Sequence, residues 1–253
     1  MKVATVWNTA FGQDELIEAL LGVNKNLVLV LLSGNAVEMP WVSRVPAIVQ
    51  GWYLGSMGGK SLADILSGAV NPSGKLPFSF PAKLTDCGAH AFDELSYPGD
   101  SIKQEYKEDI LVGYRWHDTK KIPALFPFGH GLSYTTFTYG KPMASAKAMA
   151  ADGMLTVTVA VKNTGSIAGK EIVQLYVGDD KCSVLRPVKE LKHFAKVALA
   201  PGEEKSVTFT LTPDDLKFYD EASAAWKYEP GKFKAYVCAS SADVRGVVLF
   251  EMQ

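Results

Sequence analysis

A two-residue repeat of apolar side chains runs through the C-terminal part of the chain and limits the folds open to it. Apolar residues occupy every second position from Leu155 to Val161, from Val173 to Val177 and from Val207 to Leu211. Successive side chains of a β-strand point to opposite faces, so this spacing indicates strands with one buried face. Turn signals such as Pro201–Gly202 and Pro230–Gly231 separate the strands. The pattern predicts a β-sandwich over residues 153–253, and we expect another strand within residues 187–199.

The preceding part of the chain has a different pattern. Residues 13–21 carry a helical stripe of apolar side chains that Gly22 ends, and the continuous apolar run from Leu27 to Leu32 is typical of a strand covered on both faces. A second strand at 46–50 and a helix at 56–66 follow. This alternation predicts a doubly wound α/β domain. We expect that domain and its connecting loop over residues 1–140, and an unpatterned linker over 141–152.

Charge and cysteine content exclude several classes of protein. The 26 basic residues are balanced by 27 acidic ones, so we expect no nucleic-acid partner. Cys87, Cys182 and Cys238 are widely spaced without a CxxC pair, which argues against a disulfide scaffold and a zinc ribbon. The four histidines lack metal-ligand spacing, and no apolar run approaches the roughly 20 residues that cross a bilayer. We expect no metal, no cofactor and no membrane span.

One segment imitates a phosphate-binding loop. Residues 55–61, Gly-Ser-Met-Gly-Gly-Lys-Ser, follow a predicted strand and open a predicted helix. A P-loop needs glycine five positions before its Gly-Lys-Ser, and Leu54 stands there instead. We interpret the segment as a packing turn. The Gly-x-Ser-x-Gly elbow of serine hydrolases does not occur either.

Residues 82–130 form a long loop-rich segment, which fits either the cover of a functional site or a wrapping segment over the sheet edge. Its many carboxylates could include an acid/base pair, for instance one built from Glu105 or Glu108. We favour a solvated acidic loop with one structural ion pair, such as Glu108 with Arg115. The carboxylates concerned are Asp93, Glu94, Asp100, Glu105, Glu108, Asp109 and Asp118.

Several long strings resemble one enzyme family. Three of them are similar to the C-terminal α/β domain of glycoside hydrolase family 3: LVLLSGNAVEMPW at 29–41, GWYLG at 51–55 and NPSGKLPFSFP at 71–81. Three further strings match the segment that joins this domain to an appended sandwich: YKE at 106–108, VGYR at 112–115 and FPFGHGLSYT at 126–135. Residues 154–253 resemble the fibronectin type III-like domain of the family's β-glucosidases. The resemblance implies a partial doubly wound α/β domain followed by an immunoglobulin/fibronectin type III-like sandwich.

The resemblance also implies that the catalytic carboxylates lie outside this chain. Family members carry the Asp nucleophile on an N-terminal (β/α)8 barrel, and a barrel needs about 250 residues by itself. The Glu acid/base lies in a loop just before the segment that matches Phe11 to Ile17. Residues 1–10 do not match the family there, and no Glu precedes Glu15. Glu15 falls on the predicted helix, so we assign no catalytic residue to this chain.

We therefore expect the C-terminal region of a truncated β-glucosidase-like hydrolase, inactive alone. In the complete enzyme the resemblance implies hydrolysis of terminal β-D-glucosyl residues of oligosaccharides by two carboxylates. The alternative is a non-catalytic carbohydrate-binding or scaffold module, for which Trp41, Trp52 and Trp116 are the candidate contacts. An exposed sheet edge predicts a homodimer or a complementing N-terminal domain. Enzymes of this family are often periplasmic or secreted, but the sequence does not fix the compartment. Three residues are predicted to be structural or close to substrate: Glu108, Arg115 and His130.

Overall fold

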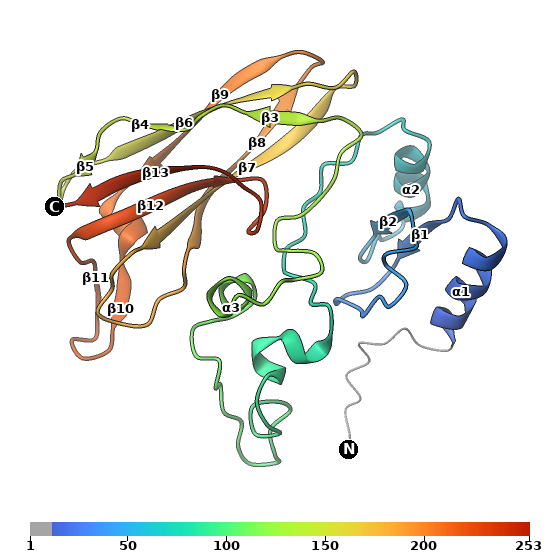
Figure 1. Ribbon diagram of the computed structural model, residues 1–253, viewed down its shortest axis with the longest axis horizontal. Helices are drawn as coiled ribbons and strands as arrows, with labels where there is room; N and C mark the ends of the chain where they lie inside the picture. Colours follow the sequence, from blue (N-terminus) through green and yellow to red (C-terminus); the bar gives the residue numbers. More distant parts are fainter. Residues whose placement is uncertain (1–11) are drawn as a thin grey trace.

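The computed structural model describes residues 12–253, and Figure 1 shows an α/β part joined to a β-sandwich by an extended loop segment. The expectations for residues 1–10 lie outside the described residues. The α/β part contains α1 (Gln13–Val23), β1 (Val28–Leu31), β2 (Ala47–Gln50) and α2 (Gly58–Leu66). β1 and β2 pair in parallel. The predicted alternation of helices and parallel strands is therefore confirmed.

The core of the α/β part forms around a buried tryptophan. Trp41 is fully buried, and its Nε1 donates a hydrogen bond to Oδ1 of Asp14 on α1 at 2.6 Å. Ile17 from α1, Met39 and Phe80 pack into the same cluster. Each of these apolar side chains contributes about 1.5–3 kcal/mol when fully buried. Packing around Trp41 therefore fixes α1 against the loops that follow the strands.

The sheet of the α/β part is more exposed than its sequence predicts. Val28 at the start of β1 retains 49% of its accessible surface, and Leu32 just after β1 retains 63%. The continuous apolar run predicts a strand covered on both faces, whereas β1 pairs with β2 alone among the described residues. Apolar residues on α1 such as Leu16 and Val23 are also exposed. The described residues therefore leave part of the apolar surface of β1 uncovered.

Residues 71–135 form the connecting segment, which is held at its base by backbone pairing between Phe80 and Phe126. It contains the short 3-10 turns η1 (Leu84–Asp86) and η2 (Gly88–His90) and one helix, α3 (Tyr114–Lys120). Gly113, with φ of 61°, precedes α3, and Lys121 in the left-handed region ends it. The segment folds into a lobe beside α3 (Figure 1).

The second part is a sandwich of two sheets. One sheet has the strand order β5-β13-β12-β7-β8; in the other, β6 pairs with β3, β4 and β9. The predicted sandwich and the predicted strand within 187–199 are confirmed. A separate hairpin joins β10 to β11. The bounds are β3 (Phe137–Tyr139), β4 (Met143–Ala144), β5 (Ala148–Met149), β6 (Leu155–Asn163), β7 (Gly169–Asp179), β8 (Glu190–Leu199), β9 (Glu204–Leu211), β10 (Phe218–Asp220), β11 (Ala225–Lys227), β12 (Gly231–Cys238) and β13 (Val244–Met252), with a 3-10 turn, η3, at Pro213–Leu216.

The two-residue apolar repeat forms the sandwich core. Leu155, Val157 and Val161 of β6 are buried, as are Val173 and Leu175 of β7. The alternate positions of β6 are at least partly exposed, as expected for a strand with one buried face. None of the helices among the described residues has both the length and the apolar character to cross a membrane.

Residues 141–152, expected to be an unpatterned linker, contribute strands to the sandwich. β4 pairs antiparallel with β6, and β5 pairs parallel with the C-terminal strand β13. β3 pairs with β6 already at Phe137 to Tyr139. Strands of two or three residues are too short for an alternating pattern, so the sequence conceals them. The expected division at residues 140 and 153 stays a prediction, and the strand pairing favours a sandwich that begins near Phe137.

Candidate functional site

Helix α3 attaches the connecting segment to the sandwich. The backbone N–H of Leu191 on β8 donates to the Tyr114 hydroxyl at 2.8 Å. The ammonium of Lys189 lies 2.6 Å from the carboxylate of Asp118, and these side chains retain only 8% and 15% of their surface. The Tyr114 ring also packs on Tyr176 of β7. α3 is therefore a structural joint between the two parts.

Arg115, one of the predicted site residues, belongs to this joint. Its Nε donates to Oε1 of Glu190 on β8 at 3.2 Å. Burial acts to raise the pKa of Glu190, but Lys192, Arg115 and Arg186 outweigh it and hold that pKa below its ordinary value. The expected pair of Glu108 with Arg115 is wrong. Arg115 lies on α3, which faces the sandwich, so its nearest carboxylate belongs to β8.

Glu108 lies on the other side of α3, within the lobe. The residue is 8% exposed, and its Oε2 has no hydrogen-bond partner among the described residues. A side chain on Gly88 would come within 2.9 Å of Glu108 Cβ and 3.1 Å of the Trp116 ring, so the backbone approaches closely here. A buried carboxylate oxygen without a donor costs at least about 1–3 kcal/mol. Glu108 is therefore a buried side chain packed against the backbone at Gly88 and not a solvent-exposed group.

The segment Phe126–Thr135 passes between the two parts with no room for side chains at its glycines. A Cβ at Gly131 would lie 2.2 Å from the carbonyl oxygen of Gly74, and a Cβ at Gly129 would lie 2.3 Å from Oε1 of Gln174. The Gln174 side chain is buried on β7 and donates to the carbonyls of Gly129 at 3.2 Å and Ala239 at 2.8 Å. The glycines of the FGHGLSYT string therefore permit close contact with Gly74 earlier in the connecting segment and with Gln174 of the sandwich.

His130 lies between these two glycines. Its ring stacks on Phe126 with centroids 5.4 Å apart, and its carbonyl accepts a hydrogen bond from the N–H of Leu76. Burial, aided by nearby Lys75, lowers the pKa of His130, so the ring is neutral at physiological pH. The three predicted residues thus have separate surroundings: Glu108 in the lobe, Arg115 on the sandwich joint and His130 in the glycine segment. Nothing brings them together as one site.

A buried ion pair joins the parts at a further point. Nζ of Lys75 lies 3.2 Å from Oε1 of Glu171 on β7, with side-chain exposures of 13% and 7%. The Tyr139 hydroxyl donates to the same carboxylate oxygen, and Lys75 also donates to the carbonyl of Gly131. Burial first, and then the Glu171 charge, raise the pKa of Tyr139 far above its usual range. The sequence does not reveal this group, because Lys75 and Glu171 lie 96 positions apart in the chain.

Two carboxylates of the lobe, Asp93 and Glu105, form surface ion pairs. Glu105 pairs with Lys103 and Lys107, and Lys107 also lies 2.5 Å from Asp93. Hydrogen bonds and charge from the two lysines hold the pKa of Glu105 below its ordinary value. A proton donor in catalysis needs the opposite shift. This observation disfavours Glu105 as an acid and supports the interpretation as a solvated acidic loop.

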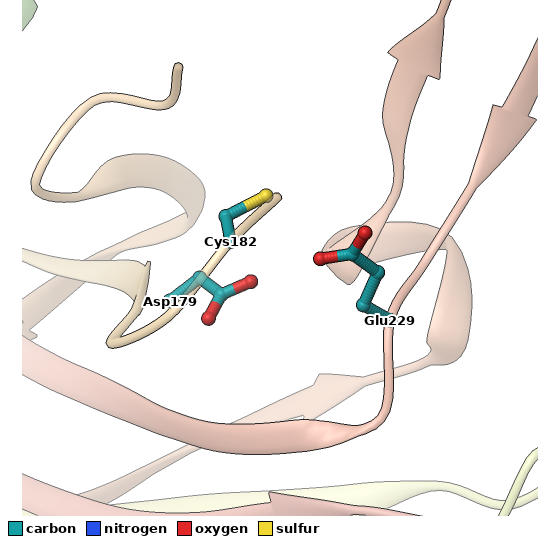
Figure 2. Close-up of side chains that lie close together, drawn as sticks. All are labelled: Asp179, Cys182 and Glu229. Atoms are coloured by element: carbon teal, nitrogen blue, oxygen red, sulfur yellow. The ribbon is translucent and has the colours of Figure 1, made fainter. Parts of the chain in front are cut away.

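The sandwich holds one cluster of metal-ligand types that the sequence did not suggest. Figure 2 shows Asp179 and Cys182, at the end of β7 and just beyond, facing Glu229 from the segment before β12. Their potential ligand atoms all lie within 4.8 Å of one another. The two carboxylates are therefore also near the spacing of about 5 Å that a retaining glycosidase uses. The residues are 50 positions apart in sequence, so spacing arguments could not find them.

The surroundings of this cluster disfavour both metal binding and catalysis by its two carboxylates. The Asp179 side chain is only 2% exposed and lies 3.6 Å from the Arg186 guanidinium, so no sugar reaches it. Oδ1 of Asp179 accepts from the N–H of Lys181, and Glu229 accepts from the backbone and hydroxyl of Ser183. Burial raises the pKa of the Cys182 thiol, which disfavours the thiolate that binds metals. Arg186 already supplies the positive charge that a metal ion would bring to Asp179.

We expect neither EDTA nor Zn²⁺ to change the thermal unfolding midpoint of the chain. A metal bound only to the folded state would raise that midpoint, and Arg186 competes for Asp179. Differential scanning fluorimetry with and without excess Zn²⁺ measures this. A rise that Cys182→Ser removes would establish a metal site and contradict the prediction.

Two of the three tryptophans proposed for sugar contact are buried in the structure. Trp41 is fully buried and Trp116 is 5% exposed. The Trp116 Nε1 donates to the carbonyl of Asp86, and Trp52 packs edge-on against Phe78. A sugar stacks on an exposed ring face, which Trp41 and Trp116 do not offer. This packing disfavours the carbohydrate-binding alternative through these residues.

Comparison with known proteins assigns both parts of the chain. Residues 4–134 match the glycosyl hydrolase family 3 C-terminal domain, and residues 171–241 match the fibronectin type III-like domain. The first match begins at residue 4, so the expectation that residues 1–10 do not match the family is wrong. The chain is 68% identical over 95% of its length to "Beta-glucosidase BoGH3A" of Bacteroides ovatus, covering 32% of that protein. It is 49% identical over 92% of its length to "Thermostable beta-glucosidase B" of Acetivibrio thermocellus, covering 30% of it.

Solved structures agree with this assignment. A β-glucosidase from Kluyveromyces marxianus in complex with glucose superimposes with a TM-score of 0.91 at 39% identity. The match covers 98% of this chain and 29% of that one. The chain thus spans about a third of the length of these relatives. The predicted α/β domain and fibronectin-like sandwich are confirmed.

Proposed function

Because the chain belongs to glycosyl hydrolase family 3, we propose that it is the C-terminal, non-catalytic region of a β-glucosidase and acts only with the rest of that enzyme. The identity of 68% to the Bacteroides ovatus β-glucosidase over almost the whole chain is the observation that carries this proposal. The substrate of the complete enzyme is then a β-glucoside or an oligosaccharide with a terminal β-linked glucose. Hydrolysis retains the anomeric configuration and uses two carboxylates.

The side-chain environments support a non-catalytic role. Retaining hydrolysis needs two accessible carboxylates about 5 Å apart, one of them an acid with a raised pKa. Asp179 is covered and faces Arg186, whereas Glu229 has its pKa lowered by the Ser183 hydroxyl and amide. Glu105 is held ionised by lysines. The nucleophile and the acid/base therefore come from polypeptide outside the described residues.

The exposed apolar surface supports a partner from the same enzyme. Leu16, Val23, Val28 and Leu32 lie on α1 and on or beside β1, and each keeps between 49% and 84% of its surface. Surfaces of this kind occur where another element or chain packs. In this proposal the catalytic portion covers them. The chain then packs against the catalytic portion as a folded region and completes the enzyme.

We expect the purified chain to show no hydrolysis of 4-nitrophenyl β-D-glucoside. We expect activity to be restored when it is mixed with the two thirds of the Bacteroides ovatus relative that it does not match. The reason is that the two pieces together provide the catalytic carboxylates and the surface that orders them. The assay measures 4-nitrophenolate release as the chain is titrated into a fixed amount of the complementing piece.

The complementing piece alone and the chain alone are the controls. Release that rises with chain concentration and saturates supports the proposal. Turnover by the chain alone that Glu229→Gln abolishes would assign catalysis to this chain and overturn it. A mixture with no more activity than the complementing piece by itself would equally contradict the proposed role.

A further inference from the structure

A small pocket opens where the end of α3 meets the turn between β12 and β13, and we call it the joint pocket. Its volume is about 260 Å³. Pockets for drug-sized molecules measure about 300–1,000 Å³, so this one has room for a smaller molecule. Apolar groups such as Pro123 and Pro127 form part of its wall. Polar side chains from three segments of the chain form the rest: Ser79, His117, Asp118, Lys121 and Ser241.

The imidazole of His117 offers one ring nitrogen to the joint pocket. The residue is 6% exposed, and its Nδ1 lies 3.0 Å from the carbonyl oxygen of Ile122. A carbonyl only accepts hydrogen bonds, so Nδ1 carries a proton and donates it. Nε2 has no hydrogen-bond partner among the described residues and is not sealed from solvent, so it faces the pocket that His117 lines. In the neutral ring this nitrogen is an acceptor.

Two buried serines of the joint pocket are held by the backbone of one residue, Phe128. Its N–H donates to Oγ of Ser79 at 3.1 Å, and its carbonyl accepts from the N–H of Ser241 at 2.8 Å. Ser79 is 8% exposed and Ser241 is 2% exposed. Within residues 12–253, neither hydroxyl donates a hydrogen bond, and that of Ser241 accepts none. Both hydroxyls are therefore fixed in position and free to donate to a ligand.

Asp118 adds a carboxylate oxygen whose charge is already balanced. Its Oδ2 lies 2.6 Å from Nζ of Lys189, whereas Oδ1 has no hydrogen bond or ion pair in the described part of the chain. The exposed Lys121 lies at the rim of the joint pocket. An anion would meet Asp118, and a cation would meet the two lysines. The pocket therefore favours a ligand without net charge.

The polar groups also exclude other kinds of ligand. A zinc ion needs at least three protein ligands, and the joint pocket supplies only His117 and Asp118. An apolar molecule would cover the serine hydroxyls and Nε2 without pairing them, which is unfavourable. A hydroxyl group both donates and accepts. A compound with hydroxyls on neighbouring carbons can therefore donate to Nε2 and Oδ1 and accept from the two serines.

We propose that the joint pocket binds a small neutral polyol and that glucose is the polyol it takes. The choice of glucose rests on the proposed function, in which the complete enzyme releases this sugar, whereas the polyol chemistry rests on the pocket alone. The occupant bridges α3 and the turn that carries Ser241 by hydrogen bonds. Because it binds only the folded joint, it stabilises the contact between the connecting segment and the sandwich.

The test follows binding of D-glucose to the isotope-labelled chain by two-dimensional amide NMR. Ser241→Ala removes a hydroxyl that makes no hydrogen bond among the described residues, so we expect an unchanged thermal unfolding midpoint. His117→Asn keeps an amide donor for the carbonyl of Ile122 and removes Nε2. The matched control is Ser206→Ala, an exposed position on β9 outside the pocket. Tetrahydropyran-2-methanol, which has the ring of glucose with a single hydroxyl, is the control ligand.

We expect glucose to shift the amide signals of Ser241 and Ile122, with a dissociation constant in the millimolar range that suits so small a ligand. Loss of one hydrogen bond should raise this constant about three- to ten-fold in Ser241→Ala and in His117→Asn. Ser206→Ala should change it less than about two-fold, and the single-hydroxyl ring should produce no shift. If His117→Asn lowers the unfolding midpoint, Ser241→Ala decides the test.

Two results would overturn the polyol site. One is the absence of shifts at glucose concentrations up to about 100 mM, which would mean that water alone fills the joint pocket. The other is an affinity for glucose that Ser241→Ala leaves unchanged, which would place the sugar elsewhere. Both leave the proposed function intact, because complementation does not depend on this pocket. Failed complementation together with the expected shifts would overturn the proposed function and still support the polyol site.

Discussion

Gly129→Ala is expected to lower the free energy of unfolding by about 3 kcal/mol. Gly129 has φ of 79°, where a Cβ costs about 1–2 kcal/mol. The new methyl group would also lie 2.3 Å from Oε1 of Gln174. That amide is buried and fixed by two carbonyls and the Tyr176 hydroxyl, so it has no space to withdraw. Overpacking of such a site adds roughly 1–3 kcal/mol.

Gly202→Ala provides the matched control. Gly202 has nearly the same φ, 75°, but a Cβ there would meet no atom within 4 Å. We expect this variant to lose about 1 kcal/mol, the backbone contribution alone. Urea unfolding of both variants measures the difference between them. Equal losses for the two variants would mean that the contact with Gln174 contributes nothing and that the glycine segment is not a tight joint.

Lys75→Met is expected to destabilise the chain by about 3 kcal/mol. Removing one partner of a buried ion pair leaves the other charge without compensation, which costs about 3–5 kcal/mol. Glu171 keeps the Tyr139 hydroxyl as a donor, so the lower end of this range applies. The loss should fall on the contact between the connecting segment and the sandwich, because Lys75 lies in that segment and Glu171 lies on β7.

Two probes can follow the parts separately. Tryptophan fluorescence reports chiefly the α/β core and the connecting segment, because Trp41 and Trp116 are buried whereas Trp226 of the sandwich part is already 66% exposed. Far-ultraviolet circular dichroism reports chiefly the sandwich strands. We expect the two urea transitions of Lys75→Met to separate, with fluorescence changing first. Lys60→Met is the control, since Lys60 pairs with Asp64 at 65% exposure and such surface pairs contribute less than about 1 kcal/mol. A Lys75→Met curve that matches the control would contradict a structural role for the buried pair.

The sequence predicts the sandwich well because its signal is local. One buried face per strand produces the alternation from Leu155 to Val161, and the structure buries those apolar positions. The same reasoning fails for β4 and β5, which are too short to alternate. The alternation also does not reveal that Gln174 is buried, because it distinguishes the two faces of β7 without showing that the glycine segment covers the outer face.

The candidate sites depend on contacts between distant residues, and the sequence predicts them poorly. The short separation in sequence favours a pair of Arg115 with Glu108, but the direction of α3 places Arg115 against Glu190, 75 positions later. Asp179 and Glu229 meet only because adjacent strands bring their ends together. Sequence motifs shared with a family identify the family of such a chain, whereas only the folded structure shows which side chains pair.

The central claim is that this chain completes a β-glucosidase without supplying its nucleophile. A 2-deoxy-2-fluoroglucoside with a good leaving group traps the covalent glycosyl-enzyme intermediate of a retaining glycosidase, so mass spectrometry of the reconstituted mixture shows which polypeptide carries the nucleophile. We expect one fluoroglucosyl adduct on the complementing piece and none on this chain. An adduct on a carboxylate of this chain, whether Asp179, Glu229 or any other, would contradict it.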